Sequence, residues 1–177
     1  MHMRSAFGVT LALLATSTPL AADHATSPRL GRPASSVEVE SWDISVAPDG
    51  EGLPPGRGTV AQGREIYVQR CQSCHGERGQ GRPADRLTGG VGTLASPAPI
   101  RTVASFWPYA TTLFDYVRRA MPIQAPLSLT DNEVYAVVGY ILSVDAIVPE
   151  TADLDAAGIR AIRMPNRDGF VPWPSSR

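Results

Sequence analysis

Lysine is absent from this chain, and only two of its 177 residues are cysteine. All 16 basic residues are therefore arginine, and they nearly balance the 17 acidic residues, which leaves a formal net charge of −1. Without an excess of positive charge, the composition gives no indication of nucleic-acid binding. Beyond the N-terminus, no segment reaches the ~18 uninterrupted apolar residues that a membrane-spanning helix needs. We therefore expect no nucleic-acid partner and no transmembrane segment in the mature protein.

The chain is long enough for one compact domain with tails, and 43% of its residues are hydrophobic. Glycine and proline, at 16 residues each, are abundant. They predict a loop-rich fold with few long elements.

The first 22 residues have the pattern of a secretory signal peptide. Arg4 is followed by a short apolar stretch over residues 6–15 and by small residues near position 22. We expect residues 1–22 to be cleaved on export, and an uncleaved membrane anchor is the alternative. An oxidising compartment permits disulfides.

The rest of the chain divides into three predicted parts. Residues 23–57 contain five prolines and are expected to form an extended N-terminal arm, in which the alternating residues 37–46 could form a strand or a docking strip. Residues 58–145 are the predicted domain, and residues 146–177 a C-terminal tail that packs on the domain or on a partner.

Within these parts, the apolar spacing predicts an all-α domain. Helices are expected from Thr59 up to the first cysteine, over residues 111–120, after the Thr130–Glu133 capping box, and over residues 153–162.

Both cysteines occur in the motif Cys71-Gln72-Ser73-Cys74-His75. A thioredoxin-like dithiol would follow a strand in a βαβ unit, and a zinc site needs about four ligands. A disulfide between the two cysteines would close a very short, strained loop. The C-x-x-C-H pattern is instead typical of one covalently attached haem c, in which Cys71 and Cys74 form thioethers and His75 binds the iron.

The second iron ligand follows by elimination. There is no lysine, no cysteine remains, and His24 lies on the arm. Met121, after the predicted helix at 111–120, is the expected ligand, and Met164 is expected to fill the core. Ligation by histidine and methionine gives the iron a higher reduction potential than ligation by two histidines, which suits electron transfer.

The run "GREIYVQRCQSCHG", followed by "AMP" and a capped C-terminal helix, resembles class I cytochrome c. The resemblance implies a few helices around the haem, of which the first and last cross at Gly63, with Tyr67 and Tyr140 packed at the crossing. It also implies that the carbonyl of Pro83 accepts a hydrogen bond from His75.

Four further residues flank the expected haem edge. Indole, phenol and guanidinium groups commonly hold haem propionates. The candidates are Trp107, Tyr109, Arg86 and Arg101. For the two aromatic residues, a place in the core is the alternative.

A closer resemblance covers residues 42–172. "RPADRLTGG", "FWPYATTLFDYVRRAMP" and "MPNRDGFVP" are similar to the SoxD-type cytochrome subunit of bacterial sulfite or sulfane dehydrogenases. This resemblance implies a periplasmic electron-transfer subunit in sulfur oxidation. Such a subunit accepts electrons from a molybdenum subunit, passes them to a downstream cytochrome or oxidase, and has no catalytic activity of its own.

There is one departure from that pattern, because full-length members can carry two haem domains and this chain has a single C-x-x-C-H motif. A free-standing carrier for another dehydrogenase remains an alternative. A haem enzyme or a sensor is a further alternative, and either would need an open iron.

Overall fold

The computed structural model describes residues 30–171. The expected signal peptide, His24 and the last six residues of the tail lie outside this range. Within it, no helix combines the length and the apolar character needed to cross a membrane.

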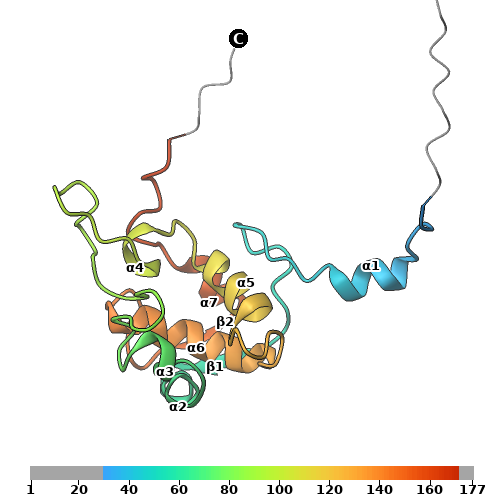
Figure 1. Ribbon diagram of the computed structural model, residues 1–177, viewed down its shortest axis with the longest axis horizontal. Coiled ribbons are helices and arrows are strands. Elements are labelled where there is room, and N and C mark those ends of the chain that lie inside the picture. The colour runs from blue at the N-terminus through green and yellow to red at the C-terminus, as the bar shows by residue number, and fades with distance from the viewer. Residues whose placement is uncertain (1–29, 172–177) are drawn as a thin grey trace, which may run out of the picture.

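The described chain is mostly helical (Figure 1). Its elements are α1 (Ser36–Trp42), β1 (Arg57–Thr59), α2 (Val60–Arg70), α3 (Gln72–His75), α4 (Val103–Phe106), α5 (Ala110–Ala120), α6 (Asp131–Val144), β2 (Asp153–Asp155) and α7 (Ala156–Ala161). The predicted helices correspond to α2, α5, α6 and α7. The capping box at Thr130 and Glu133 is present at the start of α6, and a second one at Thr59 and Gln62 begins α2.

Helix α6 is the centre of the fold. Its residues from Val134 to Leu142 are all buried, because α2, α5 and a small sheet surround it. A helix that is enclosed on every side needs an apolar sequence around its whole circumference. On the α5 side, the rings of Phe114 and Tyr135 lie 4.5 Å apart and are fully buried.

On its other side, α6 crosses α2 at very short distance, as expected. A Cβ atom added to Gly63 would lie 1.9 Å from the carbonyl oxygen of Ala136, so only glycine permits this approach. The rings of Tyr67 and Tyr140 pack beside the crossing, 5.0 Å apart. The crossing therefore fixes α2, and with it the start of the cysteine motif.

The all-α prediction omits one small sheet. Strands β1 and β2 pair antiparallel, with Gly58 opposite Leu154. Each strand has only three residues, too few for an alternating pattern to be seen in the sequence. The pairing holds the beginning of the tail against the entry to α2.

The rest of the described tail also packs on the domain. Met164 is 1% exposed and belongs to the core. The side-chain amide of Asn166 donates to the carbonyl of Phe106 at 2.7 Å, and Phe170 lies edge-on to the ring of Phe106.

The arm differs from the extended segment that the sequence predicts. Residues 36–42 form helix α1 instead of a strand, because Ser35 and Glu38 make a capping box. Residues 44–56 are irregular and lie on the domain. Val46 is buried, its N–H donates to Asp115 at 2.9 Å, and the Tyr135 hydroxyl donates to the carbonyl of Pro54 at 2.8 Å.

The α2–α6 crossing provides a test of this fold. Gly63→Ala should lower the free energy of unfolding by on the order of 3 kcal/mol, because the new methyl group overlaps a backbone carbonyl that cannot move alone. Gly139→Ala, on α6, is the matched control: its Cβ would lie 3.3 Å from a Leu154 methyl group, which can move aside. The control should change the stability by no more than about 1 kcal/mol. Urea denaturation measures both, and equal effects would contradict the crossing.

Candidate functional site

The cysteine motif occupies one helical turn at the end of α2. Cys71 ends α2, and its N–H donates to the carbonyl of Tyr67 at 2.9 Å. The N–H of His75 then donates to the carbonyl of Cys71 at 3.0 Å, which closes the turn of α3. Cys71, Cys74 and His75 all line the same cavity. The structure thus brings the three predicted attachment and ligand residues together.

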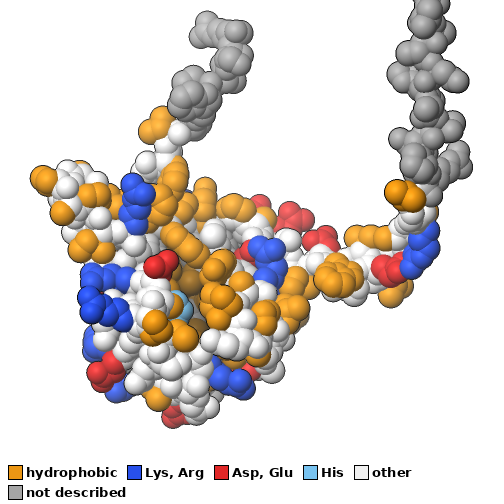
Figure 2. All heavy atoms as spheres, viewed as in Figure 1, with side chains coloured by type: hydrophobic (Ala, Val, Ile, Leu, Met, Phe, Trp, Pro, Cys, Tyr) orange, Lys and Arg blue, Asp and Glu red, His pale blue; other side chains and the backbone are white. Residues whose placement is uncertain are grey.

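This cavity has a volume of about 690 Å³, within the range of cofactor pockets in proteins. Its walls are formed by apolar side chains of α4, α5, α6 and the connecting segments: Leu87, Val103, Phe106, Leu113, Val117, Leu129, Val137 and Ile141. Figure 2 shows a histidine side chain (pale blue) inside a hollow bordered by hydrophobic side chains. It is His75, since the other two histidines precede residue 30.

A backbone carbonyl orients the imidazole of His75. The Nδ1–H group donates to the carbonyl of Asp85 at 2.8 Å. The resemblance implied the carbonyl of Pro83 as the acceptor, and this prediction is wrong. The N–H of Ala84 is bonded to the carbonyl of Cys74 at 2.8 Å. This contact holds the segment around Ala84 beside the cysteine motif, where the carbonyl of Asp85 reaches the imidazole. Pro83 itself is exposed and is not part of the cavity lining.

The hydrogen bond from Nδ1 determines which nitrogen is available. With Nδ1 protonated and bonded to the carbonyl, Nε2 keeps its lone pair for a metal ion. Such a backbone acceptor also increases the basicity of the ligating nitrogen.

Neither cysteine takes part in a disulfide. Burial raises the pKa of the Cys71 thiol to about 11, and the neighbouring Cys74 adds to the increase. The thiol of Cys71 is therefore protonated at neutral pH. A thiol that acts as a nucleophile needs the opposite shift, towards a stable thiolate, so the site does not favour sulfur-transfer chemistry.

Of the two candidate methionines, Met121 is the one in the cavity. It follows α5 directly and lines the wall together with Pro122 and Gln124. The Gln124 amide nitrogen approaches the Cys74 sulfur to 4.0 Å, which shows that this segment crosses back towards the motif. Met164 lies in the core and is not part of the cavity lining, as expected.

The residues predicted at the cofactor edge separate into two groups. Trp107, Arg86 and Arg101 line the cavity. Tyr109 is not part of this lining, contrary to the prediction. It precedes the first turn of α5, and its ring instead lies under the guanidinium of Arg167 at 4.1 Å.

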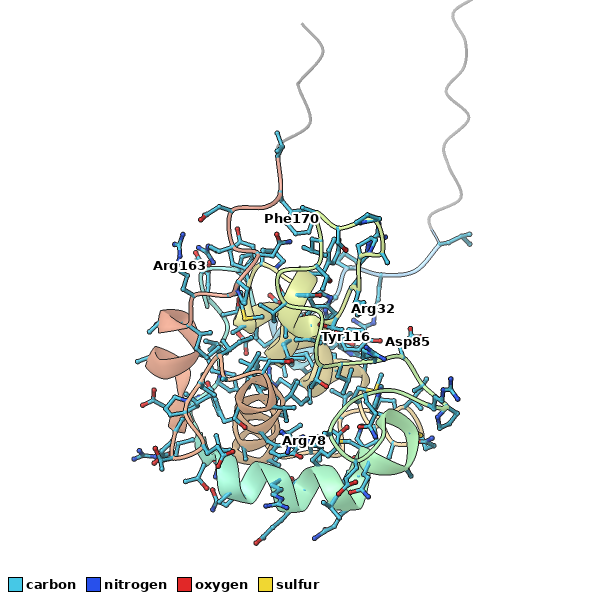
Figure 3. All side chains as sticks on the ribbon, turned by 90° about the vertical axis from the view of Figure 1, so that its left-hand side faces the viewer. Arg32, Arg78, Asp85, Tyr116, Arg163 and Phe170 are labelled. Atoms are coloured by element: carbon cyan, nitrogen blue, oxygen red, sulfur yellow. The ribbon has the colours of Figure 1, made fainter. Side chains whose placement is uncertain are left out.

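The sequence interpretation missed Tyr116. This residue lines the cavity, is 46% exposed, and packs edge-on against Trp107 at 5.8 Å. Its position in Figure 3 is at the surface, near the labelled Asp85. The helical spacing could have indicated that Tyr116 faces the cavity. It is three residues after Leu113 on the same helix, and residues at this spacing share a face.

Comparison with known proteins gives three matches. Residues 58–141 match the family described as cytochrome c oxidase, cbb3-type, subunit III. The chain is 27% identical to a thiosulfate dehydrogenase of Stutzerimonas stutzeri. The match covers 58% of this chain but only 36% of the thiosulfate dehydrogenase. It also superimposes on a chain of the sulfane dehydrogenase SoxCD from Paracoccus pantotrophus, with a TM-score of 0.77 and 37% identity. That match covers 82% of this chain and 72% of the other.

The chain therefore belongs to the cytochrome c family, whose members carry covalently bound haem c. Within that family it is related to the haem-bearing SoxD chain of SoxCD. The residues of the cavity fit this cofactor. Two thiols on one helical turn, an imidazole with a free Nε2 and a thioether meet in an apolar space.

The covalent attachment can be tested directly. The purified protein should keep its haem through denaturation and acid–organic extraction, and its pyridine adduct should show the absorption of a porphyrin with two thioethers. In the double variant Cys71→Ala, Cys74→Ala, the haem should be extractable. Ser73→Ala, between the two cysteines, is the matched control and should keep the haem. Retention of haem by the double variant under these conditions would contradict the assignment.

Proposed function

We propose that this protein is a monohaem c-type cytochrome of the periplasm that accepts electrons from a molybdenum-containing sulfite- or sulfane-oxidising subunit. The observation that carries the proposal is the cavity in which Cys71, Cys74, His75 and Met121 meet. The similarity to the SoxCD chain supports the choice of partner. A downstream cytochrome or oxidase then takes up the electrons.

Bound haem c supplies a one-electron Fe(III)/Fe(II) couple. The residues of the chain determine how that couple behaves. Cys71 and Cys74 hold the porphyrin at the end of α2. His75, whose Nδ1–H donates to the carbonyl of Asp85, would ligate the iron through Nε2. The apolar walls from α5 and α6 exclude water, and burial is one of the factors that set the potential of a haem.

Met121 is the proposed second ligand, and it decides between the classes of function. A peroxidase or a gas sensor needs an open position on the iron. The thioether of Met121, on the segment after α5, would occupy that position, which favours electron transfer as the function. We therefore expect no catalytic activity of this chain by itself.

The polar side chains of the lining have a separate role in the proposal. The guanidinium groups of Arg86 and Arg101 and the indole of Trp107 line the cavity. They are suited to bind the carboxylates of the haem propionates through charge-assisted and neutral hydrogen bonds.

Ligation by Met121 predicts a clear spectroscopic result. Met121→Ala should remove the weak sulfur-to-iron absorption band and allow the reduced protein to bind carbon monoxide. Met164→Leu is the matched control, because Met164 is buried away from the cavity. It should leave the band in place and the protein unreactive to the gas. The reverse pattern would transfer the ligand role to Met164.

A periplasmic location follows from the expected signal peptide over residues 1–22 and is in keeping with the usual location of such cytochromes. The alternative of a free-standing carrier also has support in the structure. Residues 44–57 and the described tail both pack on the domain of this chain, and residues that pack in this way do not require a partner.

The choice between complex and free carrier can be made in solution. The haem protein, co-expressed with the molybdenum subunit from the same source, should elute with it during size exclusion in ~0.5 M salt, where attraction between exposed charges is largely screened. Addition of sulfite, or of a sulfane-sulfur substrate, should then reduce the haem in the mixture but not in the isolated chain. Separate elution together with an unreduced haem would count against the complex.

A further inference from the structure

Helix α1 is the least buried element of the described chain. None of its residues is buried. Its apolar side chains are largely exposed: Trp42 by 84%, Val37 by 72% and Val39 by 51%. Figures 1 and 2 show α1 apart from the body formed by α2–α7, with hydrophobic side chains on its surface. A large exposed aromatic residue beside exposed valines is typical of an interaction surface.

Local contacts specify a helix here, although nothing packs against it. Ser35 and Glu38 form a capping box, and Arg32 makes an ion pair with Glu38. A helix of seven residues is nevertheless too short to be stable in water by such contacts alone. Packing of its apolar side chains against another surface would supply the missing stabilisation.

The helix ends close to a fixed point of the body. The guanidinium of Arg118 donates to the carbonyl of Ile44 at 3.1 Å, and the side chain of Val46, two residues further on, is buried. The chain is thus held directly after α1. This arrangement presents Trp42 at a defined place beside the domain.

The superposition on the SoxCD chain includes this region. It covers 82% of the 177 residues, or about 145 residues. Even a matched span that ended at residue 177 would therefore begin at residue 33 or earlier, and α1 lies within it. The similarity to a chain of SoxCD thus extends over the span that contains α1.

Charge and position indicate the kind of surface that fits α1. Val39 and Trp42, at i and i+3, line one concave surface together with Ala34. Arg32, Glu38 and Asp43 line it as well. Arg32 forms an ion pair with Glu38, whereas Asp43 forms no ion pair within residues 30–171. Figure 2 shows the hollow with the histidine and α1 on the same face of the molecule, with α1 projecting beyond the body. A partner that covers this face can contact both the cavity mouth and α1.

We propose that α1 is a docking helix that inserts Val39 and Trp42 into an apolar groove of the molybdenum-containing partner, beside a basic side chain that faces Asp43. Amphipathic helices bind grooves of this kind through anchors at i and i+3, and a central tryptophan commonly dominates the binding energy. The inference rests on the proposed function, because the partner is the proposed electron donor.

The test measures the affinity of the haem-loaded chain for the purified molybdenum subunit by isothermal titration calorimetry. The double variant Val39→Asp, Trp42→Asp should raise Kd at least tenfold. Its haem spectrum and thermal unfolding should not change, since α1 buries nothing. Val91→Asp is the matched control: Val91 is 47% exposed, as accessible as Val39, but lies on the body. It should bind as the unaltered chain does.

Three results would overturn the inference. If the unaltered chain binds and the double variant binds equally well, α1 is not the docking element, and the proposed function still stands. If the unaltered chain neither binds the subunit nor accepts electrons from it, both proposals fail. If the isolated chain is a dimer by light scattering and the double variant is a monomer, α1 serves self-association instead.

Discussion

The contact between α2 and α6 at Gly63 is the constraint on which the rest of the structure depends. Two helix backbones meet where the residue lacks a side chain, with Tyr67 and Tyr140 packed at the edge of the contact. Since α2 cannot slide or rotate against α6 without overlap, the turn that follows it has one position. That turn carries the cysteine motif, and the opposite wall of the cavity is α6 itself.

The cavity is mostly apolar, and its charged lining residues are few. Arginine side chains and Asp85 contribute to the lining, whereas the groups of the cysteine motif are uncharged or bonded to a neutral acceptor. The Cys71 thiol is kept protonated by burial before attachment, and the His75 imidazole is oriented by a backbone carbonyl instead of a carboxylate. A neutral acceptor leaves no additional negative charge beside the iron, and this favours a higher potential than a carboxylate acceptor would.

The segments outside the central helices have different relations to the domain. The tail completes the core with Met164 and supports the cavity wall through Phe106, and residues 44–57 cover the other side. Only α1 makes no comparable contribution to the described structure. An element that contributes no burial to its own domain is free to contribute burial elsewhere, and this is the role that we propose for α1.

The chemistry of the site was determined by the sequence itself. Cys71, Cys74 and His75 are adjacent, so one helical turn brings them together, and the absence of lysine left few residues for the second ligand. The main helices were also predictable, because their apolar spacing and capping boxes act over three or four residues. Contacts between distant segments were not predictable from such local patterns.

Only the tertiary structure decided that Asp85 and not Pro83 accepts from His75, that Tyr116 and not Tyr109 reaches the cavity, and that residues 57–59 pair with residues 153–155. Each of these choices depends on where a loop or a helix end is placed by packing against other elements. A shift of two residues exchanges the carbonyl of Pro83 for that of Asp85. The residue types alone do not distinguish between such alternatives, since the competing groups are chemically equivalent.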